Sequence, residues 1–231
     1  MASENTLFVL TKNKILILVE GLTEEKFVKD IVYPYFQSKG LYCIPKIATT
    51  KMVKNGPNFK GGIVSYEKTK KDIMFLLEDT NAIVTTMIDY YGFSNLVPFR
   101  DSIKGNNCFE RVKFTEVLFK KDINSDRFIP YLQLHEFEAM TFVSPKEIAN
   151  TMVEISKEKQ VFEIKSHFNS PEEINDNPET IPSRRLKNIF KSYQKTLHGP
   201  LITKRIGIEA IRKECKHFND WLEKLEILKS E

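Results

Sequence analysis

The sequence predicts an α/β fold in which helices cover a parallel, doubly wound sheet. Lys14–Val19 is an unbroken apolar run after its lysine, which is typical of a central strand buried on both faces. Ala82–Ile88 is apolar and rich in β-branched residues, which also favours a buried strand. Segments with helical spacing of apolar residues alternate with these runs. That alternation indicates βαβ units and therefore a parallel sheet.

The first predicted strand is followed by a tight turn and a helix. Thr23 is suited to cap this helix, acidic residues follow in its first turn, and Pro34 ends or kinks it. Leu41–Ile47 is predicted to be the second strand. Thr49–Gly62 is rich in glycine and lysine, which predicts a basic loop. A helix over Ser65–Glu78 then leads into the next strand.

The second half of the chain is predicted to contain one more strand and several helices. The strand spans Phe128–Leu134, a loop spans Ser170–Pro182, and the helices span Arg111–Lys120, Pro145–Ile155, Arg184–Tyr193 and Ile208–Leu228. No linker divides the chain, so we expect a single domain. Its α/β core would span about 12–145, and a helical addition from about 146–231 would pack on that core.

The composition is that of a globular protein and excludes several classes of function. Of the 231 residues, 41% are hydrophobic and 29% are charged. No apolar run approaches the roughly 20 residues that span a bilayer, and the first residues lack the pattern of a signal peptide. We therefore expect a cytoplasmic protein that does not enter a membrane. The absence of Walker A, G-x-G-x-x-G and G-x-S-x-G motifs argues against an ATPase, a dehydrogenase or a serine hydrolase.

Positive charge is concentrated in two stretches, although the net charge is only +4. No Asp or Glu occurs between Ile31 and Tyr66 or between Ile181 and Ile208. Such stretches favour a polyanion partner, so we expect nucleic-acid contacts; a solvated lysine-rich surface is the alternative. The residues expected to make these contacts are Lys51, Lys54, Lys60, Arg184, Arg185 and Lys195.

Three predicted strands end in carboxylates. Glu20 follows the first strand, Asp89 follows the third, and Glu136 and Glu138 follow the fourth. The carboxyl ends of parallel strands lie at one edge of a sheet, where sites of open α/β folds are found. Carboxylates placed together repel one another, and a hard divalent cation such as Mg²⁺ compensates that charge. The pattern therefore predicts a metal site, while turn and cap residues are the structural alternative.

Two motifs resemble the TOPRIM fold of topoisomerases, primases and OLD-family nucleases. They are V-E-G-x-T-E-E at Val19–Glu25, which is most similar to the OLD nucleases, and M-I-D-Y-Y-G at Met87–Gly92. Three further segments, Leu134–Ala139, Pro182–Arg185 and Tyr193–Ile202, look like a bacterial family of TOPRIM-like proteins without an assigned function. Members of that family often sit beside ATPase genes in phage-defence settings. The resemblance covers Ile15 to Leu225.

The resemblance implies roles for particular carboxylates. Glu20 is similar to the strand-one glutamate that acts as metal ligand or general acid/base, and Glu24 to a second ligand one helical turn on. Asp89 is similar to the first Asp of a D-x-D motif, whose second position holds Tyr91. Because that replacement removes one expected ligand, a second metal ion is in doubt. As a hypothesis, Glu136 or Glu138 replaces the missing ligand, with Glu136 at the catalytic centre.

The resemblance therefore implies a Mg²⁺- or Mn²⁺-dependent endonuclease acting on DNA or RNA, in bacterial phage defence. The implied partners are nucleic acid and an ATPase of the ABC or OLD type, with self-association left open. A catalytically inactive module that binds nucleic acid or the partner is the first alternative. A phosphotransfer enzyme of the primase kind is the second.

Several nearby residues have both a functional and a structural interpretation. His135 would be a general acid/base or a hydrogen-bonded strand end. Tyr90 and Tyr91 would stack a base or pack in the core. Ser183, with the two arginines that follow it, would grip a phosphate or merely cap a helix.

Overall fold

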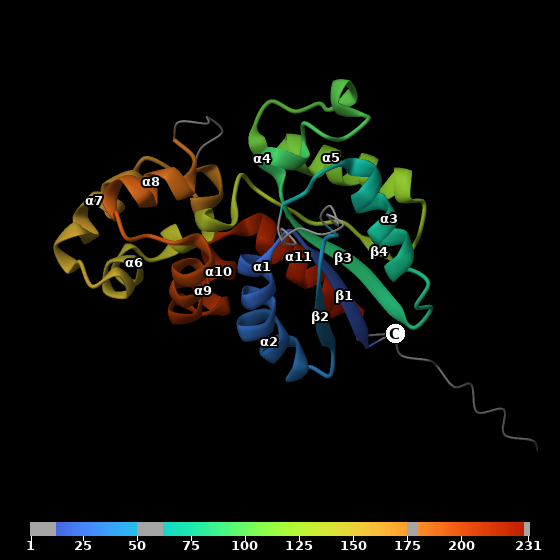
Figure 1. Cartoon of the computed structure of the whole chain (residues 1–231), viewed down its shortest axis with the longest axis horizontal. Helices are drawn as coiled ribbons and strands as arrows, with labels where there is room; N and C mark the ends of the chain where they lie inside the picture. Colours follow the sequence, from blue (N-terminus) through green and yellow to red (C-terminus); the bar gives the residue numbers. More distant parts are fainter. Residues whose placement is uncertain (1–12, 50–61, 175–179, 229–231) are drawn as a thin grey trace, which may run out of the picture.

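A five-stranded parallel sheet lies at the centre of the protein (Figure 1). The computed structural model describes residues 13–49, 62–174 and 180–228. The strand order is β2-β1-β3-β4, and β5 pairs with β3 beyond β4. The strands are β1 (Lys14–Val19), β2 (Tyr42–Ile47), β3 (Ala82–Asp89), β4 (Phe128–Ile129) and β5 (Leu132–Gln133). The predicted fold class, an α/β fold with a parallel sheet and added C-terminal helices, is confirmed.

The sheet register brings several strand ends to one edge. Val19 at the end of β1 is level with Ile47 of β2 and with Met87 of β3. Asp89 at the end of β3 is level with Gln133 of β5. The residues that follow these strands therefore emerge close together, as expected for parallel strands.

Helices cover both faces of the sheet because β1 is apolar on both sides. Ile15, Ile17 and Val19 pack into a core with α1 (Leu22–Phe27) and α11 (Lys216–Ile227), whereas Leu16 and Leu18 pack into a second core with α3 (Tyr66–Leu76) and α5 (Cys108–Ile123). Each of these β1 side chains is at most 5% exposed. Burying one such side chain contributes roughly 1.5–3 kcal/mol, so this strand fixes the sheet between two helical layers.

The helices occupy most of the remaining described residues. The α-helices are α1 (Leu22–Phe27), α2 (Tyr33–Gln37), α3 (Tyr66–Leu76), α4 (Tyr90–Phe93), α5 (Cys108–Ile123), α6 (Pro145–Met152), α7 (Glu158–Ser166), α8 (Pro182–Ile189), α9 (Lys195–Ile206), α10 (Ile208–Glu214) and α11 (Lys216–Ile227). The 3-10 segments are η2 (Arg100–Ser102), η3 (Phe137–Val143), η4 (Ile155–Lys157) and η5 (Pro171–Glu173), and a π-helical segment, η1 (Val28–Val32), joins α1 to α2.

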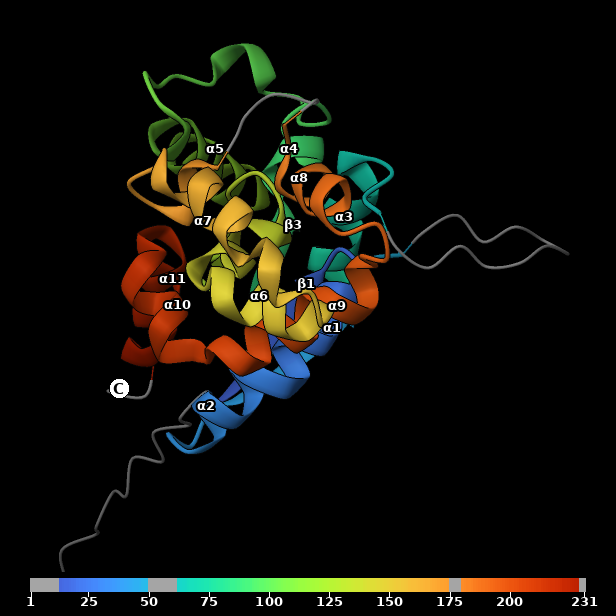
Figure 2. The same ribbon diagram turned by 90° about the vertical axis from the view of Figure 1, so that its left-hand side faces the viewer.

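The C-terminal helices pack on the sheet domain in two groups. Helices α6 to α9 share a core beside the sheet, on the left of Figure 1 and facing the viewer in Figure 2. Helices α10 and α11 return to the sheet, where Phe218, Trp221 and Leu222 join the β1 core. The C-terminal segment thus contributes both to the core shared by α6 to α9 and to the β1 core of the sheet.

Two predicted elements differ from the structure because of prolines. Of the two outcomes predicted for Pro34, an end or a kink, the end does not occur: the helix continues to Gln37 after the wider π-type turn of η1, which adapts it to a residue without an N–H. The predicted strand over 128–134 is interrupted at Pro130, which cannot donate to a neighbouring strand. There the Oγ1 of Thr86 accepts from the Tyr131 N–H at 3.0 Å and donates to the Tyr131 carbonyl at 2.8 Å.

Helices α4, α7 and α9 escape the sequence prediction, and several predicted helices end earlier; helix α6, for example, ends at Met152 instead of Ile155. Helix α8 ends at Ile189 instead of Tyr193. Helices α7 and α9 lie in segments that were not predicted to be helical. Helix α9 contains Gly199 and Pro200, two residues that ordinarily argue against a helix interior.

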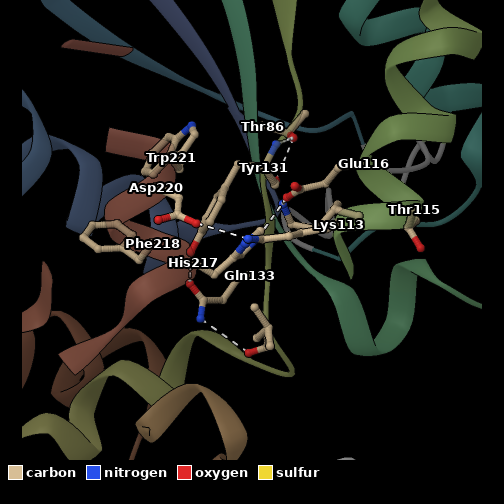
Figure 3. Close-up of polar contacts among 12 residues, drawn as sticks. Thr86, Lys113, Thr115, Glu116, Tyr131, Gln133, His217, Phe218, Asp220 and Trp221 are labelled. Carbon is tan, nitrogen blue, oxygen red and sulfur yellow. Dashed lines mark hydrogen bonds and ion pairs between the residues drawn. The ribbon is translucent and has the colours of Figure 1, made fainter. Parts of the chain in front are cut away.

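A buried polar network anchors the last strand to the helices on either side (Figure 3). Oε1 of Glu116 in α5 accepts from the Leu132 N–H at 2.8 Å and lies 2.9 Å from Nε2 of His217 in α11. The Tyr131 ring stacks on His217 and on Trp221, with ring centroids 5.2 Å and 4.4 Å apart. The network fixes β5, and with it the chain that continues from β5 into Glu136.

Candidate acidic site

Five predicted carboxylates and one lysine meet at the carboxyl edge of the sheet. We call this group the acidic cluster, and its residues are Glu20, Glu24, Asp89, Glu136, Glu138 and Lys195. The carboxylates follow β1, β3 and β5 or lie in the first turn of α1, and the lysine begins α9. The parallel pairing of the strands explains why the carboxylates lie close together. The packing of α9 against α1 and η3 explains why Lys195 lies beside them.

Glu20 and Asp89 are joined through the backbone. Oε2 of Glu20 accepts from the Asp89 N–H at 3.3 Å, and Oδ1 of Asp89 accepts from the Phe137 N–H at 2.9 Å. Each carboxylate is therefore oriented by an N–H group of the next element around the edge. Both side chains remain partly exposed.

Glu24 turns back toward the start of its own helix. It is the third residue of α1, and its Oε2 accepts from the Gly21 N–H at 2.9 Å. This satisfies an N–H group that the helix leaves without an internal partner. The predicted cap residue, Thr23, lies inside the helix, and Gly21 holds the cap position. Glu24 is only 7% exposed, so its carboxylate is largely removed from water.

Glu136 and Glu138 share the ammonium group of Lys195. The Lys195 Nζ lies 2.8 Å from Oε1 of Glu136 and 3.3 Å from Oε2 of Glu138. Glu136 also accepts from the Ser183 N–H at 3.0 Å and from its hydroxyl at 3.1 Å. The Tyr193 hydroxyl donates to Glu138 at 3.5 Å. Ser183 of α8, Lys195 of α9 and Tyr193 of the connection between these helices thus complete the acidic cluster.

The electrostatics of the acidic cluster favour protonation or a bound cation. Burial, followed by the charges of Glu20 and Glu138, raises the pKa of Glu24 to about 7. Burial, followed by the charges of Glu20 and Glu24, raises the pKa of Asp89 above its ordinary value. Burial also raises the pKa of Glu20 and of Glu138, against the opposing charge of Lys195.

The neighbouring carboxylates also change the pKa of Lys195, in the direction that keeps its ammonium group charged. Burial alone would lower the pKa of its ammonium group, but the charges of Glu138 and Glu136 raise that pKa above its ordinary value. The lysine is therefore charged whenever these carboxylates are.

The donor set fits a hard cation held by few protein ligands. Among the residues that the structure describes, no three or more His, Cys, Asp or Glu side chains are grouped so that together they could hold a metal ion. Mg²⁺ needs fewer, because it binds through one or two carboxylates and keeps several waters. Carboxylates that raise one another's pKa supply such oxygens, so an ion with one or two ligands fits, whereas a cage of protein ligands does not.

The predicted nucleic-acid contacts fall into three groups. Lys51, Lys54 and Lys60 lie outside the described residues. Arg184 is exposed on α8, whereas Arg185 donates through Nε to the Thr180 carbonyl at 2.6 Å and lies over the Phe168 ring. Lys195 belongs to the acidic cluster instead of an open surface.

Other residues highlighted by the sequence have structural roles next to the acidic cluster. His135 is buried and has a left-handed backbone, with φ of 59°, which ends the strand before Glu136. The Tyr91 N–H donates to the His135 carbonyl, and Tyr90 packs against the apolar core of the α3 and α5 face. Ser183 does not cap α8, since Ile181 holds that position.

A separate hollow lies away from the acidic cluster. Its volume is about 650 Å³, and it lies between α5 and α11 beside β4. Its lining includes Val117, Phe128 and Ile227, but none of the residues of the acidic cluster. The acidic cluster and this hollow are therefore separate features of the molecule.

Sequence reasoning missed the groups that complete the acidic cluster from the C-terminal helices. Tyr193 carries no signal that would link it to Glu138, and the Ser183–Glu136 contact spans 47 positions. The acid-free stretch around Lys195 was the available signal, but it predicted a contact with nucleic acid instead of ion pairs with Glu136 and Glu138.

The fold and site define an α/β protein with an acidic site at the carboxyl edge of a parallel sheet. The chain belongs to the family described as domain of unknown function DUF4276, whose model matches residues 19–226. No curated protein and no solved structure matches the chain. Across 13–49, 62–174 and 180–228, every helix is too short or too polar to cross a membrane.

Proposed function

We propose that this protein is a Mg²⁺- or Mn²⁺-dependent nuclease that hydrolyses phosphodiester bonds in DNA or RNA. The observation that carries the proposal is the joining of Glu20 to Asp89 at the carboxyl edge, beside a third carboxylate, Glu24. Burial and mutual repulsion make this arrangement unfavourable unless protons or a cation compensate. Its motifs also resemble those of TOPRIM nucleases.

Glu20 and Asp89 are the residues that would hold the ion. Glu20 accepts from the Asp89 N–H and Asp89 from the Phe137 N–H, and both residues are partly exposed to solvent. When bound, the ion would neutralise charge on the phosphodiester and make water more acidic. Glu24, with its pKa of about 7, would exchange a proton near neutral pH.

The basic residues in the segment that carries Lys195 support a polyanionic substrate. The stretch between Ile181 and Ile208 holds no acidic residue. Its exposed basic residues on and between α8 and α9 are Arg184, Lys187, Lys191, Lys204 and Arg205. Positive charge of this kind holds a phosphate backbone without reading its sequence.

Cleavage of plasmid DNA, single-stranded DNA and tRNA by purified protein, with Mg²⁺ or Mn²⁺, tests the proposal. The variants are Glu20→Ala and Asp89→Ala, with Asp101→Ala as a control because Asp101 is an exposed carboxylate. Loss of cleavage in both site variants but not in the control supports the nuclease. Cleavage that survives both removals would show that the activity lies elsewhere.

A binding module without catalysis is the second candidate. Tyr91 stands where the resembling motif has its second acid, and the described residues hold no site with three or more protein ligands. Such a module would bind nucleic acid or a partner without taking up Mn²⁺ at the acidic cluster. The implied ATPase partner and role in phage defence rest on the resemblance. If no substrate is cleaved, repeating the assay with an ATPase of the implied type separates a binding module from an enzyme that is silent without its partner.

A further inference from the structure

The ammonium group of Lys195 lies between two buried carboxylates. It is 2.8 Å from Glu136 and 3.3 Å from Glu138, whose side chains are 9% and 1% exposed. The lysine side chain itself is 39% exposed. One positive charge therefore faces two negative charges at a place where water cannot screen them well.

The fold seats Lys195 in this position through a close helix contact. Lys195 is the first residue of α9, which packs against α1 and η3. A Cβ on Gly199 would lie 3.2 Å from Cε1 of Phe137 and 3.5 Å from Cγ2 of Thr23. Gly199 thus lets α9 pack closely against α1 and η3, where a larger residue would hinder the contact. This close packing places Lys195 next to the carboxylates.

The other half of the acidic cluster is arranged differently. Glu20, Glu24 and Asp89 accept hydrogen bonds from the N–H groups of Asp89, Gly21 and Phe137. Backbone N–H groups orient these carboxylates but bring no full positive charge. The two halves therefore differ in their ion pairs: Lys195 contacts both carboxylates of one half, whereas among the described residues it reaches Glu20 and Asp89 only at longer range.

We propose that Lys195 serves as a built-in cation for Glu136 and Glu138, so that the protein binds one divalent ion, in the half formed by Glu20 and Asp89. The inference rests on the proposed function and deepens it by fixing the number of ions. Tyr91 agrees with a single ion, because it offers no carboxylate where the resembling motif has its second one. Glu136 and Glu138 then hold the lysine instead of completing a metal shell.

Counting bound Mn²⁺ on the full chain tests this inference without any activity assay. Titration followed by electron paramagnetic resonance or calorimetry should give one ion for the wild type and two for Lys195→Met. Lys195→Arg keeps the charge and should give one. Lys121→Met removes an exposed lysine of α5 and should also give one. Adding Glu20→Ala to Lys195→Met should reduce the count from two to one.

The outcomes separate this inference from the proposed function. A wild type that binds two ions overturns the inference without any variant. A folded Lys195→Met that binds one ion also overturns it, and in both cases the nuclease proposal stands. A wild type that binds no Mn²⁺ overturns both. Lys195→Gln can still hydrogen-bond to both carboxylates, so it supplies a folded neutral variant, also expected to bind two ions, if Lys195→Met does not fold.

Discussion

The backbone N–H of Asp89 lies 3.3 Å from Oε2 of Glu20, although the two residues are 69 positions apart in the sequence. The contact joins the ends of β1 and β3, two adjacent parallel strands. It places two carboxylates at one edge with a fixed relative orientation. Four predictions follow from this edge and from the packing that supports it.

Asp89→Asn should weaken Mn²⁺ binding by at least tenfold, or about 1.4 kcal/mol, while the fold is retained. The amide oxygen can still accept from the Phe137 N–H, so the hydrogen bond that orients the side chain survives. The negative charge that attracts the cation is lost. Calorimetric titration measures the affinity, and thermal unfolding checks the fold. Unchanged Mn²⁺ affinity in a folded variant would place the ion elsewhere.

The free energy of unfolding, measured in a chelator, should fall as pH rises from about 4.5 to about 7. In the folded protein Glu24 keeps its proton up to a pKa of about 7, whereas the ordinary value is 4.5. Between these values the folded state binds more protons than the unfolded state, so rising pH favours unfolding. The loss due to Glu24 is on the order of 3 kcal/mol.

Urea denaturation at pH 5 and pH 8 measures this loss. Glu24→Gln cannot titrate and should lose less stability than the wild type between the two pH values. Glu25→Gln is the matched control, since Glu25 is the next residue in α1 and pairs with Lys29 at the surface. If the free energy of unfolding depended on pH equally in Glu24→Gln and the wild type, that result would contradict the raised pKa of Glu24.

Gly199→Ala should destabilise the protein by about 1 kcal/mol, within a net range of about 0–2 kcal/mol. The new Cβ would lie 3.2 Å from Phe137, which is 1% exposed and packs edge-on against Phe27, so the ring has little room to move. Overpacking costs about 1–3 kcal/mol, which exceeds the roughly 1 kcal/mol gained in helix propensity at most sites. Gly92→Ala in α4 has open space around it and is the control for propensity. A Gly199→Ala variant as stable as the wild type would show that α9 can shift freely.

Glu116→Ala should cost about 2–4 kcal/mol in the free energy of unfolding. The change leaves the buried Leu132 N–H and His217 Nε2 without their acceptor and opens a cavity. Glu116→Gln keeps one carbonyl oxygen in the same place and should cost less. Chemical denaturation of both variants measures the difference. Equal costs would mean that the negative charge of Glu116, and not its volume or a single carbonyl oxygen, anchors β5.

The sequence was most informative where local chemistry decides the structure. The Lys14–Val19 and Ala82–Ile88 strands were predictable because buried parallel strands require unbroken apolar residues, and Glu20 and Asp89 follow them directly. Helix α9 was not predictable, since Gly199 and Pro200 disfavour a helix, and tertiary packing overrides that preference. The contact of Lys195 with Glu136 spans 59 positions, and no local pattern encodes such a distance.

The position of Lys195 in α9, after the carboxylates in the sequence, affects the order in which the acidic cluster can form during synthesis. A ribosome releases the chain from its N-terminus, so both carboxylates that pair with Lys195 emerge well before it. Until α9 docks, Glu136 and Glu138 lack their counter-charge, and the sheet edge cannot take its final form. Completion of the acidic cluster is therefore coupled to the synthesis and docking of α9.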